Sequence, residues 1–428
     1  MTRFWIAMLC LGCASQGADQ LRRHGMIGLS VGPDGQNRLE VKALVEGGAG
    51  AAAGLRAGDL IQSMDGAPVT SSDQFVHAVA RHFGGDSVQV GFMRGEEMGI
   101  KTVVLKPRPL ETSAYADVMY QSLKVRGSLR RAIVTRPRKA GRLPAVLLMQ
   151  GVGCYSVDSA DRKSGYGRVI GELEQRGFVT MRVEKTGEGD SEGPECEDVH
   201  ATPDLEADGY VAGLRALKQY DFVDAEKVFV FAHSMGPVVG SLAIAQERVR
   251  GFMAVETVGT GWFEYDLERL RVQAALTGKA PDAVDAEVRE YTGCSYRFYL
   301  GKETPEQLDQ TPVCRGFTAP FGGTPYTYMQ AVADISLGRQ WKQADFPVLV
   351  VYGTGSPVTT AHQSRYLAEL INRLHPGRAT YVEVPGMGHD LNRYASQEEY
   401  MQRGNTPHTF HTGLIEVMMA WLNQQLAA

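Results

Sequence analysis

The 428-residue sequence predicts two folded domains, a small β-rich domain followed by a large α/β domain with a mostly parallel sheet. Three observations support this prediction. Short β patterns separated by glycine-marked turns occupy residues 24–107, strand and helix patterns alternate over residues 112–428, and an insertion at about 258–345 is helical in pattern and rich in aromatic residues. Alternating strands and helices indicate a doubly wound sheet with helices on both faces.

The N-terminus has the layout of a secretory signal peptide, expected over residues 1–18. A positive residue, Arg3, precedes a short apolar run and then small residues. The alternative is an apolar first element of the mature protein. Cys13 also resembles a bacterial lipoprotein cleavage site, although Cys10 stands where that pattern usually has leucine. We therefore expect an exported protein, periplasmic or secreted, with no transmembrane segment.

Composition narrows the range of partners. The hydrophobic fraction of 43% and the charged fraction of 22% are typical of a soluble globular protein. The net charge is −5 and no basic run is dense, so no nucleic-acid partner is expected. No cysteine has the CxxC or histidine spacing of a zinc site, and we expect neither a metal nor a cofactor.

Four cysteines follow the N-terminal segment, and an even set in an exported protein favours disulfides. Cys294 and Cys314 lie twenty residues apart within the insertion, and closing that loop should stabilise it by about 3 kcal/mol. Cys154 and Cys196 should then pair with each other. Sequence alone does not determine the pairing.

The first domain is expected to contain, in order, a strand LEVKALV, a helical turn at 51–54, a strand from Leu60 to the Asp65-Gly66 turn, a helix SSDQFVHAVARHF and a hairpin turning at Gly95. This order, and the segment AGLRAGDLIQSMDG above all, resembles the PDZ domain of bacterial periplasmic proteases. The resemblance implies that the N–H groups of Ile27, Gly28 and Leu29, in the loop that starts at Met26, bind the terminal carboxylate of a protein or peptide. The alternative is a domain that only packs against its neighbour.

The second domain follows the linker PRPLETSAY. Its expected elements are, in order, the strands LRRAIVTRP and PAVLLMQ, the helix YGRVIGELEQRG, the strand FVTMRVEKTG, the helix DLEADGYVAGLRALKQY, the strand KVFVFAHS with a helix from Met235, the strands RGFMAVETV, FPVLVVYGTG and ATYVEVPGMGH, and a C-terminal helix.

The sharpest chemical signal is Ser234, in Ala232-His233-Ser234-Met235-Gly236 after the apolar strand VFVF. A nucleophilic serine needs a tight strand-to-helix turn with small neighbours, and the usual pattern is G-x-S-x-G. Ala232 replaces the first glycine, which still leaves room. The alternative is a serine that only caps the helix.

Two further segments accompany the Ser234 motif: Gln150-Gly151-Val152-Gly153 after an earlier strand and PGMGHD after the last strand. Together they make nearly all of residues 112–428 resemble the α/β-hydrolase superfamily, and most closely its serine aminopeptidase-like and esterase branch. The resemblance implies a helical cap at 258–345. It also implies that Ser234 is the nucleophile and that Val152 and Met235 donate the oxyanion N–H groups.

The same resemblance makes His389, in the loop after the last strand, the base. His233 is its main rival, but it neighbours the nucleophile on the same turn and a structural role is favoured. His408 and His411 lie beyond the expected loop.

The superfamily usually completes its catalytic triad with an acid that orients the base, and this sequence departs from the usual pattern at that acid. Ser356 occupies the position after FPVLVVYG where the superfamily usually has aspartate. Glu256 stands at the end of the preceding strand, RGFMAVETV, and a carboxylate there is costly unless it is hydrogen-bonded or paired. We expect Glu256 to serve His389; the alternatives are a Ser–His dyad, with Glu256 bound to a cap residue such as Arg269, and Asp390, which is a poorer candidate.

The sequence thus predicts an exported serine hydrolase that cleaves carboxylic esters or related acyl compounds, with a small acyl substrate. One alternative is a peptidase that uses the PDZ domain to capture protein C-termini. Another is a catalytically weak binding protein on a hydrolase scaffold.

Overall fold

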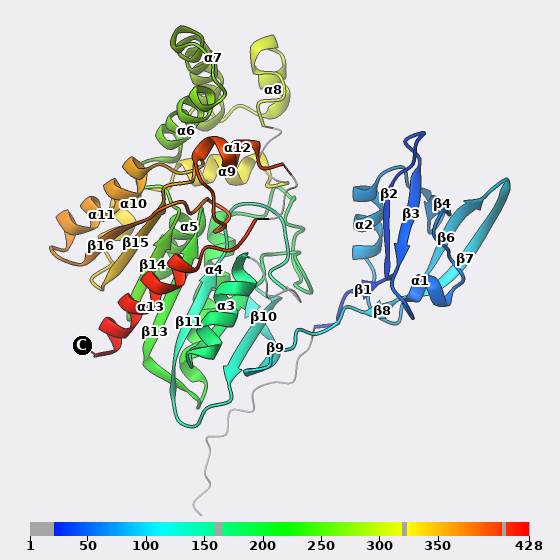
Figure 1. The fold of residues 1–428 in the computed structure, drawn as a ribbon, viewed down its shortest axis with the longest axis horizontal. Helices are drawn as coiled ribbons and strands as arrows, with labels where there is room; N and C mark the ends of the chain where they lie inside the picture. Colours follow the sequence, from blue (N-terminus) through cyan, green and yellow to red (C-terminus); the bar gives the residue numbers. More distant parts are fainter. Residues whose placement is uncertain (1–20, 159–164, 319–322, 405–407, 428) are drawn as a thin grey trace, which may run out of the picture.

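The structure is a computed structural model that describes residues 21–158, 165–318, 323–404 and 408–427. The expected signal peptide at 1–18, with Cys10 and Cys13, lies outside the described residues. Within the described ranges no helix is long and apolar enough to cross a membrane. Figure 1 shows a small domain next to a larger one, joined by extended segments.

The small domain is an antiparallel sheet with two helices. In spatial order its strands are β2 (Leu29–Pro33), β3 (Leu39–Leu44), β4 (Leu60–Met64), β6 (Ser87–Arg94) and β7 (Glu97–Val104), with β5 (Ala67–Pro68) paired to β4 and helices α1 (Ala49–Ala52) and α2 (Ser72–Ala80). The turn at Asp65-Gly66 is tight, because both residues have positive φ, 48° and 81°. Its core is formed by alternating strand residues such as Val41, Val88 and Val103, all fully buried.

Two short strands join the domains. β1 (Gly25–Met26) and β8 (Lys106–Pro107) pair antiparallel, so the chain enters and leaves the small domain side by side. Arg23, just before β1, reaches into the large domain, where its Nη1 lies 2.7 Å from Asp158 Oδ2 and 2.5 Å from Asp190 Oδ2. Both carboxylates are almost fully buried, so this arginine anchors the N-terminal segment to the large domain.

The large domain is built on an eight-stranded sheet. In spatial order the strands are β16 (Ala379–Val384), β15 (Val348–Gly353), β14 (Gly251–Val255), β13 (Val223–His233), β11 (Leu143–Met149), β12 (Val179–Val183), β10 (Ser128–Pro137) and β9 (Ala116–Val125). All neighbouring pairs from β16 to β12 are parallel, and β10 is antiparallel to both its neighbours. The expected doubly wound, mostly parallel sheet is confirmed.

Helices cover both faces of this sheet. Helices α3 (Gly165–Gln175) and α13 (Thr412–Ala427) share one hydrophobic cluster with the sheet, and α4 (Pro203–Gln219), α5 (Gly236–Ile244) and α11 (Ala361–Leu374) share the other. Residues of β11 alternate between the clusters: Leu148 faces α3 and α13, whereas Leu147 and Met149 face α4 and α5. The apolar run of β11 is therefore explained by burial on both sides.

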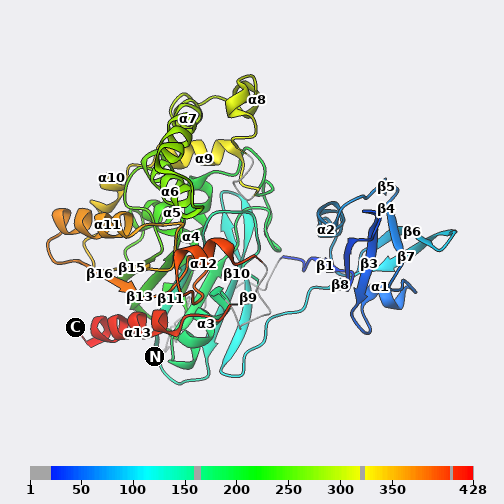
Figure 2. The ribbon, with the colours of Figure 1, turned by 45° about the horizontal axis from the view of Figure 1, so that its top comes forward.

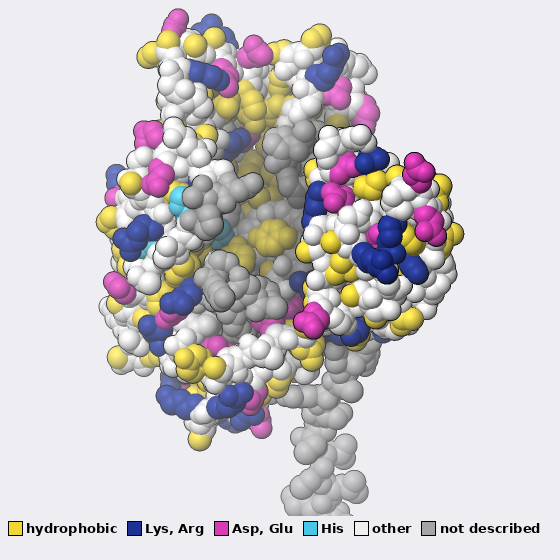
Figure 3. Space-filling view, turned by 45° about the vertical axis from the view of Figure 1, so that its right-hand side comes forward, with side chains coloured by type: hydrophobic (Ala, Val, Ile, Leu, Met, Phe, Trp, Pro, Cys, Tyr) yellow, Lys and Arg dark blue, Asp and Glu magenta, His cyan; other side chains and the backbone are white. Residues whose placement is uncertain are grey.

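The insertion between β14 and β15 is helical, and we call it the cap. It contains α6 (Trp262–Leu276), α7 (Pro281–Tyr299), α8 (Pro305–Asp309), a 3-10 turn (Pro312–Cys314), α9 (Tyr326–Ala333) and α10 (Leu337–Trp341). Figures 1 and 2 show α6 to α9 gathered at one end of the large domain. In the space-filling view, hydrophobic side chains gather in a hollow below these helices (Figure 3).

Two elements of the large domain were not expected from the sequence: strand β9, and helix α11 between β15 and β16. β9 directly follows the segment expected to be a linker and pairs with β10 over its full length, from Ala116↔Pro137 to Val125↔Ser128. As the edge strand of the sheet it is only partly buried, so its apolar pattern is weak and its strand structure depends on the β10 ladder. The small helix α12 (Gln397–Gln402) lies in the loop after β16.

Candidate active site

Ser234 lies on the sharp turn between β13 and α5. Its φ is 60°, a strained value for a residue with a side chain, and its N–H donates to Val255 O at 3.0 Å. Small neighbours make the turn possible. A Cβ added to Gly236 would lie 2.7 Å from Met149 O, and one added to Gly151 would lie 3.0 Å from Ser234 Cβ. The structure thus places Ser234, which is half-buried, on the tight strand-to-helix turn that the G-x-S-x-G pattern predicts.

His389, in the loop after β16, lies between Ser234 and Glu256. Its Nε2 is 2.9 Å from Ser234 Oγ, and its Nδ1 is 3.3 Å from Glu256 Oε2. One tautomer fits both contacts, with Nδ1–H donating to the carboxylate and Nε2 accepting from the serine hydroxyl. The three side chains come from three loops at the carboxyl ends of β13, β14 and β16.

Glu256 is fully buried and directly follows β14 with φ 52°. Its carboxylate accepts the Thr359 hydroxyl at 2.6 Å and the N–H of Gly353. Ser356, at the usual aspartate position, is also fully buried, but its Oγ accepts the weak N–H contacts of Val358 and Thr359. The carboxylate next to the His389 imidazole is thus that of Glu256.

The alternative partners of Glu256 and His389 are engaged elsewhere. Arg269 donates to Asp266 Oδ1 at 2.7 and 3.1 Å. Asp390 accepts hydrogen bonds from Asn392 and from the Tyr394 hydroxyl, the latter at 2.7 Å. These contacts leave Glu256 as the carboxylate that meets His389.

His233 has both ring nitrogens in structural contacts. Its Nδ1 lies 2.8 Å from the Tyr166 hydroxyl, and its Nε2 lies 2.8 Å from the backbone oxygen of His389. Burial, with a contribution from the neighbouring His389, lowers the pKa of His233 to about 3, so the ring is neutral. The Tyr166 hydroxyl also accepts the Gly151 N–H at 3.0 Å. His233 therefore links the loop that carries His389 to the loop after β11.

The two expected oxyanion donors, Met235 and Val152, belong to the start of α5 and to the loop after β11. Met235 is buried at the start of α5, where helix N–H groups point out of the first turn. Val152 is half-buried in the loop after β11 and packs against the hydrophobic cluster that the cap shares. The preceding Gly151 is the residue in close contact with Ser234.

Glu184 and Lys185, directly after β12, contact the same loop, which we call the oxyanion loop (residues 150–158). Glu184 accepts the Ser156 hydroxyl at 2.6 Å and the N–H groups of Val157 and Asp158 at 2.9 and 3.1 Å. Burial raises its pKa to about 7. Lys185 contacts the loop carbonyls. Sequence reasoning missed both residues, and their only signal is two opposite charges that directly follow an apolar strand.

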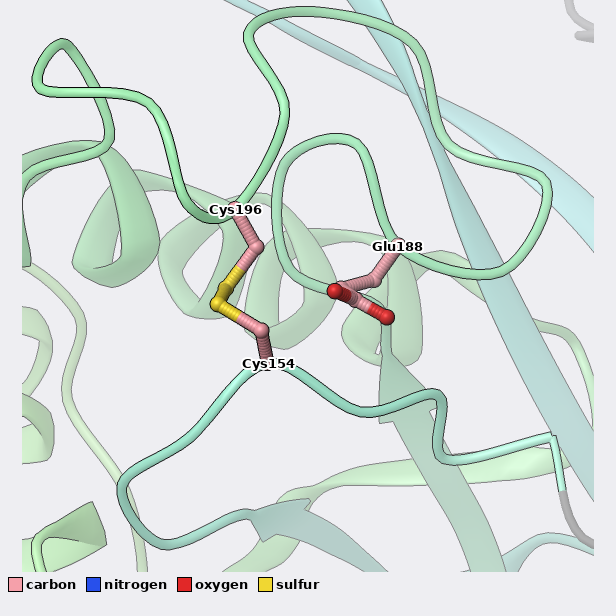
Figure 4. A group of neighbouring side chains, drawn as sticks. All are labelled: Cys154, Glu188 and Cys196. Carbon is pink, nitrogen blue, oxygen red and sulfur yellow. A yellow bond between two sulfur atoms is a disulfide. The ribbon is translucent and has the colours of Figure 1, made fainter. Parts of the chain in front are cut away.

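A disulfide also holds this loop. Cys154 and Cys196 are bonded as expected, and Figure 4 shows the Glu188 carboxylate beside them. One ligand atom from each of the three residues lies within 4.8 Å of the others. Because the two sulfurs are bonded to each other, they offer no thiolate, so this arrangement is not a metal site. The second expected pair, Cys294 and Cys314, links α7 to the 3-10 turn.

The aromatic residues of the cap mostly form its own core. Tyr265 and Tyr299 are buried, and Trp262 Nε1 donates to the Tyr299 hydroxyl at 3.1 Å. Tyr291 donates to the buried Asp266 carboxylate at 2.7 Å. The hydroxyls of Tyr291 and Tyr299 both donate to Asp266, so these two rings serve internal hydrogen bonds of the cap, whereas Tyr296 is 58% exposed.

Ile27, Gly28 and Leu29 form the loop that leads into β2. Gly28 has φ 72°, a value that favours glycine. β2 is the edge strand of its sheet, and α2 lies beside it, with Ser72 Oγ donating to Val31 O at 3.4 Å. An extended peptide could add to this edge in the way expected.

Comparisons with known proteins agree with this architecture. The model of the PDZ domain matches residues 25–105, and the model of the alpha/beta hydrolase family matches residues 140–401. No curated protein matches the sequence.

Among solved structures, similarity is found to DcsB in complex with its substrate analogue, with 18% identity over 73% of this chain and 100% of that chain and a TM-score of 0.48. Est1E from Butyrivibrio proteoclasticus is 16% identical over 73% of this chain and 99% of that one, with a TM-score of 0.45. The esterase PF2001 of Pyrococcus furiosus is 12% identical over 65% of this chain and 87% of that one, with a TM-score of 0.42.

Proposed function

The chain belongs to the alpha/beta hydrolase family and carries an N-terminal PDZ domain, and from that premise we propose that it is an exported serine hydrolase that cleaves carboxylic esters or related acyl compounds. One observation carries the proposal: the Ser234 hydroxyl, the His389 imidazole and the Glu256 carboxylate form a continuous chain with contacts of 2.9 and 3.3 Å. A hydroxyl, a base and an orienting acid in this order are what nucleophilic acyl transfer requires.

In the proposed mechanism, His389 Nε2 takes the Ser234 proton as Oγ attacks the acyl carbon. Glu256 holds the imidazole in the required tautomer and stabilises the imidazolium. The N–H groups of Val152 and Met235 bind the oxyanion of the tetrahedral intermediate. His389 then protonates the leaving alcohol, and a water molecule, activated in the same way, releases the acyl group from Ser234.

Esters are preferred over peptides because the described residues near Ser234 include no charged group placed to bind a peptide amine. The buried charges nearby are already paired: Asp266 with Arg269, and Lys185 with Glu206. The PDZ domain keeps a peptidase as the second candidate, since that domain class binds peptide C-termini.

A paired assay tests the proposal. The wild type should hydrolyse short-chain p-nitrophenyl esters much faster than the matching peptide p-nitroanilides, and Ser234→Ala should abolish both activities. Ester hydrolysis that persists in Ser234→Ala defeats the serine mechanism. Faster cleavage of the anilides would favour the peptidase instead.

Two finer proposals concern location and the PDZ ligand. Export is supported by the two disulfides, which persist in oxidising compartments. We propose that Ile27, Gly28 and Leu29 bind a free peptide carboxylate. Amidating the C-terminus of a binding peptide should therefore strongly lower its affinity for the PDZ domain. Equal affinity for the acid and the amide counts against this site.

A further inference from the structure

Lys185 is a buried cation whose three ammonium protons all have acceptors. Its side chain is 6% exposed, and Nζ lies 3.0 Å from Gly151 O, 3.2 Å from Gly153 O and 3.3 Å from Glu206 Oε2. Burying an ammonium ion costs several kcal/mol even when it is paired. A packing role alone would be met by an apolar side chain, so two carbonyl contacts to one loop indicate a more specific use.

Those contacts determine the direction of the peptide group next to Ser234. In a trans peptide the carbonyl and the following N–H point in opposite directions. When Lys185 holds the Gly151 oxygen, the N–H of Val152 must therefore point away from Lys185. Gly151 is also the residue that meets Ser234, where an added Cβ would lie 3.0 Å from the serine Cβ.

The neighbouring amides of the loop are already used. Gln150 N–H donates to the Tyr210 hydroxyl at 3.3 Å, and Gly151 N–H donates to the Tyr166 hydroxyl at 3.0 Å. The Tyr210 hydroxyl donates in turn to Glu206 Oε1 at 2.8 Å. The loop is thus held through its amides by tyrosines and through its carbonyls by Lys185, and Val152 N–H is the next amide along the chain.

We infer that Lys185 is a positioning residue of the oxyanion hole: its ammonium group holds the Gly151 and Gly153 carbonyls so that Val152 N–H is presented to the oxyanion formed on Ser234. This role rests on the proposed function. Glu206 supports this role, because its carboxylate lies 3.3 Å from Lys185 Nζ and accepts the hydroxyls of Tyr210 and of Tyr328 in the cap, the latter at 2.7 Å.

The rival explanation is that the Lys185–Glu206 pair only stabilises the fold. Lys185→Met removes the charge at similar length but leaves the Glu206 charge unpaired. The double variant Lys185→Met/Glu206→Gln removes both charges, so it should recover much of the stability without restoring the hold on the loop. Lys218→Met is the matched control, since Lys218 contacts one carboxylate (Glu247, 3.1 Å) and one backbone oxygen (Arg248, 2.6 Å) on the outer part of the domain.

The experiment measures kcat and KM on a p-nitrophenyl ester, with the number of active sites counted by end-point labelling with a fluorophosphonate. Removing a single oxyanion donor lowers kcat by about 100- to 1000-fold. Misdirecting one should lower kcat per labelled site by about 10- to 100-fold in both Lys185 variants, with KM little changed. The serine hydroxyl adds to the carbonyl of an aryl trifluoromethyl ketone, and the adduct carries an oxyanion. The inhibition constant of this ketone should therefore rise in parallel with the loss of kcat. The control variant Lys218→Met should match the wild type in both measurements.

The possible outcomes distinguish a failure of the positioning role of Lys185 from a failure of the proposed hydrolase function. If the double variant recovers its melting temperature and its kcat per labelled site equals that of the wild type, Lys185 has a structural role only and the inference is wrong. If KM rises while kcat and the ketone affinity stay unchanged, the inference is equally wrong. If the wild type itself shows no hydrolysis that depends on Ser234, the proposed function fails, and the positioning role fails with it.

Discussion

At the scale of single residues, Glu256 is the feature that most distinguishes this site. The carboxylate reaches His389 from the end of β14 rather than from the loop after β15, and Thr359 and Gly353 hydrogen-bond it in place. Its positive φ is a strained conformation of the kind that persists at functional sites. A buried, fully hydrogen-bonded acid of this kind suits the orientation of an imidazole.

Glu256→Gln should lower kcat by about 100- to 10,000-fold, because an amide cannot stabilise the imidazolium or select the tautomer. Ser356→Asp is the companion variant. It should bring no gain in activity and should lower the melting temperature, since it adds a second buried carboxylate beside Glu256. Steady-state kinetics on a p-nitrophenyl ester checks both variants, and a more active Ser356→Asp together with an unaffected Glu256→Gln would favour the dyad.

His233 should make the protein less stable in acid. Its pKa is about 3 in the folded state against an ordinary value near 6.5, so between these values the unfolded chain binds a proton that the native protein does not. Its contribution to stability is therefore complete above pH 6.5 and falls by about 1 kcal/mol for each pH unit below it.

The variant His233→Gln keeps a donor for the His389 carbonyl but cannot titrate. Urea unfolding at pH 7.5 and pH 5 should show a smaller loss of unfolding free energy in this variant than in the wild type. The same loss in both proteins would contradict the neutral, buried state of His233.

The sequence carries different amounts of information about these residues. Ser234 and His389 stand in local motifs with a fixed place relative to a strand, and Glu256 is a charge at the end of an apolar strand. Lys185 could not be assigned a role in this way, because its partners are backbone carbonyls that any residue supplies and that only the folded loop brings together.

At the scale of elements, the oxyanion loop makes few hydrogen bonds within itself, such as Gln150 Nε2 to Tyr155 O at 3.2 Å, and many to its neighbours. Glu184 accepts its distal amides, Lys185 holds its first carbonyls, and the Cys154–Cys196 disulfide ties it to the loop after β12. The loop has no helix or strand of its own, so its conformation depends on these contacts together with the hydrogen bonds from its amides to Tyr166 and Tyr210.

Removing the Cys154–Cys196 disulfide should therefore lower activity as well as stability. Closing a loop with a sequence separation of 42 stabilises by about 4 kcal/mol in the chain-entropy model. The double variant Cys154→Ala/Cys196→Ala should lose kcat per labelled site. The control Cys294→Ala/Cys314→Ala, which opens a cap disulfide, should lose stability with little change in kcat. Equal effects of both pairs on kcat would contradict this role.

The elements also show where pattern reading fails. β13, β14 and β15 are apolar runs buried on both sides of the sheet, and the sequence predicts them directly. β9 is an edge strand with only two buried positions besides Tyr120, so its sequence carries only a weak strand pattern. Its strand structure is a consequence of the tertiary pairing with β10.

At the scale of the whole molecule, an ion-pair cluster joins the segment before the PDZ domain to the large domain. Arg23 precedes the PDZ domain in sequence, yet its side chain is only 14% exposed and its guanidinium contacts Asp158 and Asp190 of the large domain. Asp190 also accepts from the buried Arg131 at 3.0 Å. Sequence predicts the order of the domains, but a pairing between residues more than a hundred positions apart has no local pattern.

Arg23→Met should destabilise the protein by about 3 kcal/mol, because it removes the cation that lies between two buried carboxylates and leaves Asp158 without its ion-pair partner. Arg22→Met is the matched control, since Arg22 forms an exposed pair with Asp86 and should change stability little. Thermal unfolding of the full chain compares the two variants. Similar melting temperatures for both would show that the Arg23 anchor contributes nothing to stability.

The central claim is that Ser234 is a nucleophile activated by His389, and covalent labelling tests it most directly. The full-length protein is treated with a fluorophosphonate, and the modified residue is identified by peptide mass spectrometry in the wild type, Ser234→Ala and His389→Ala. We predict one adduct per chain, located on Ser234, with none in Ser234→Ala and a strongly slowed reaction in His389→Ala. An unlabelled wild type, or a label that persists on another residue in Ser234→Ala, would contradict the claim.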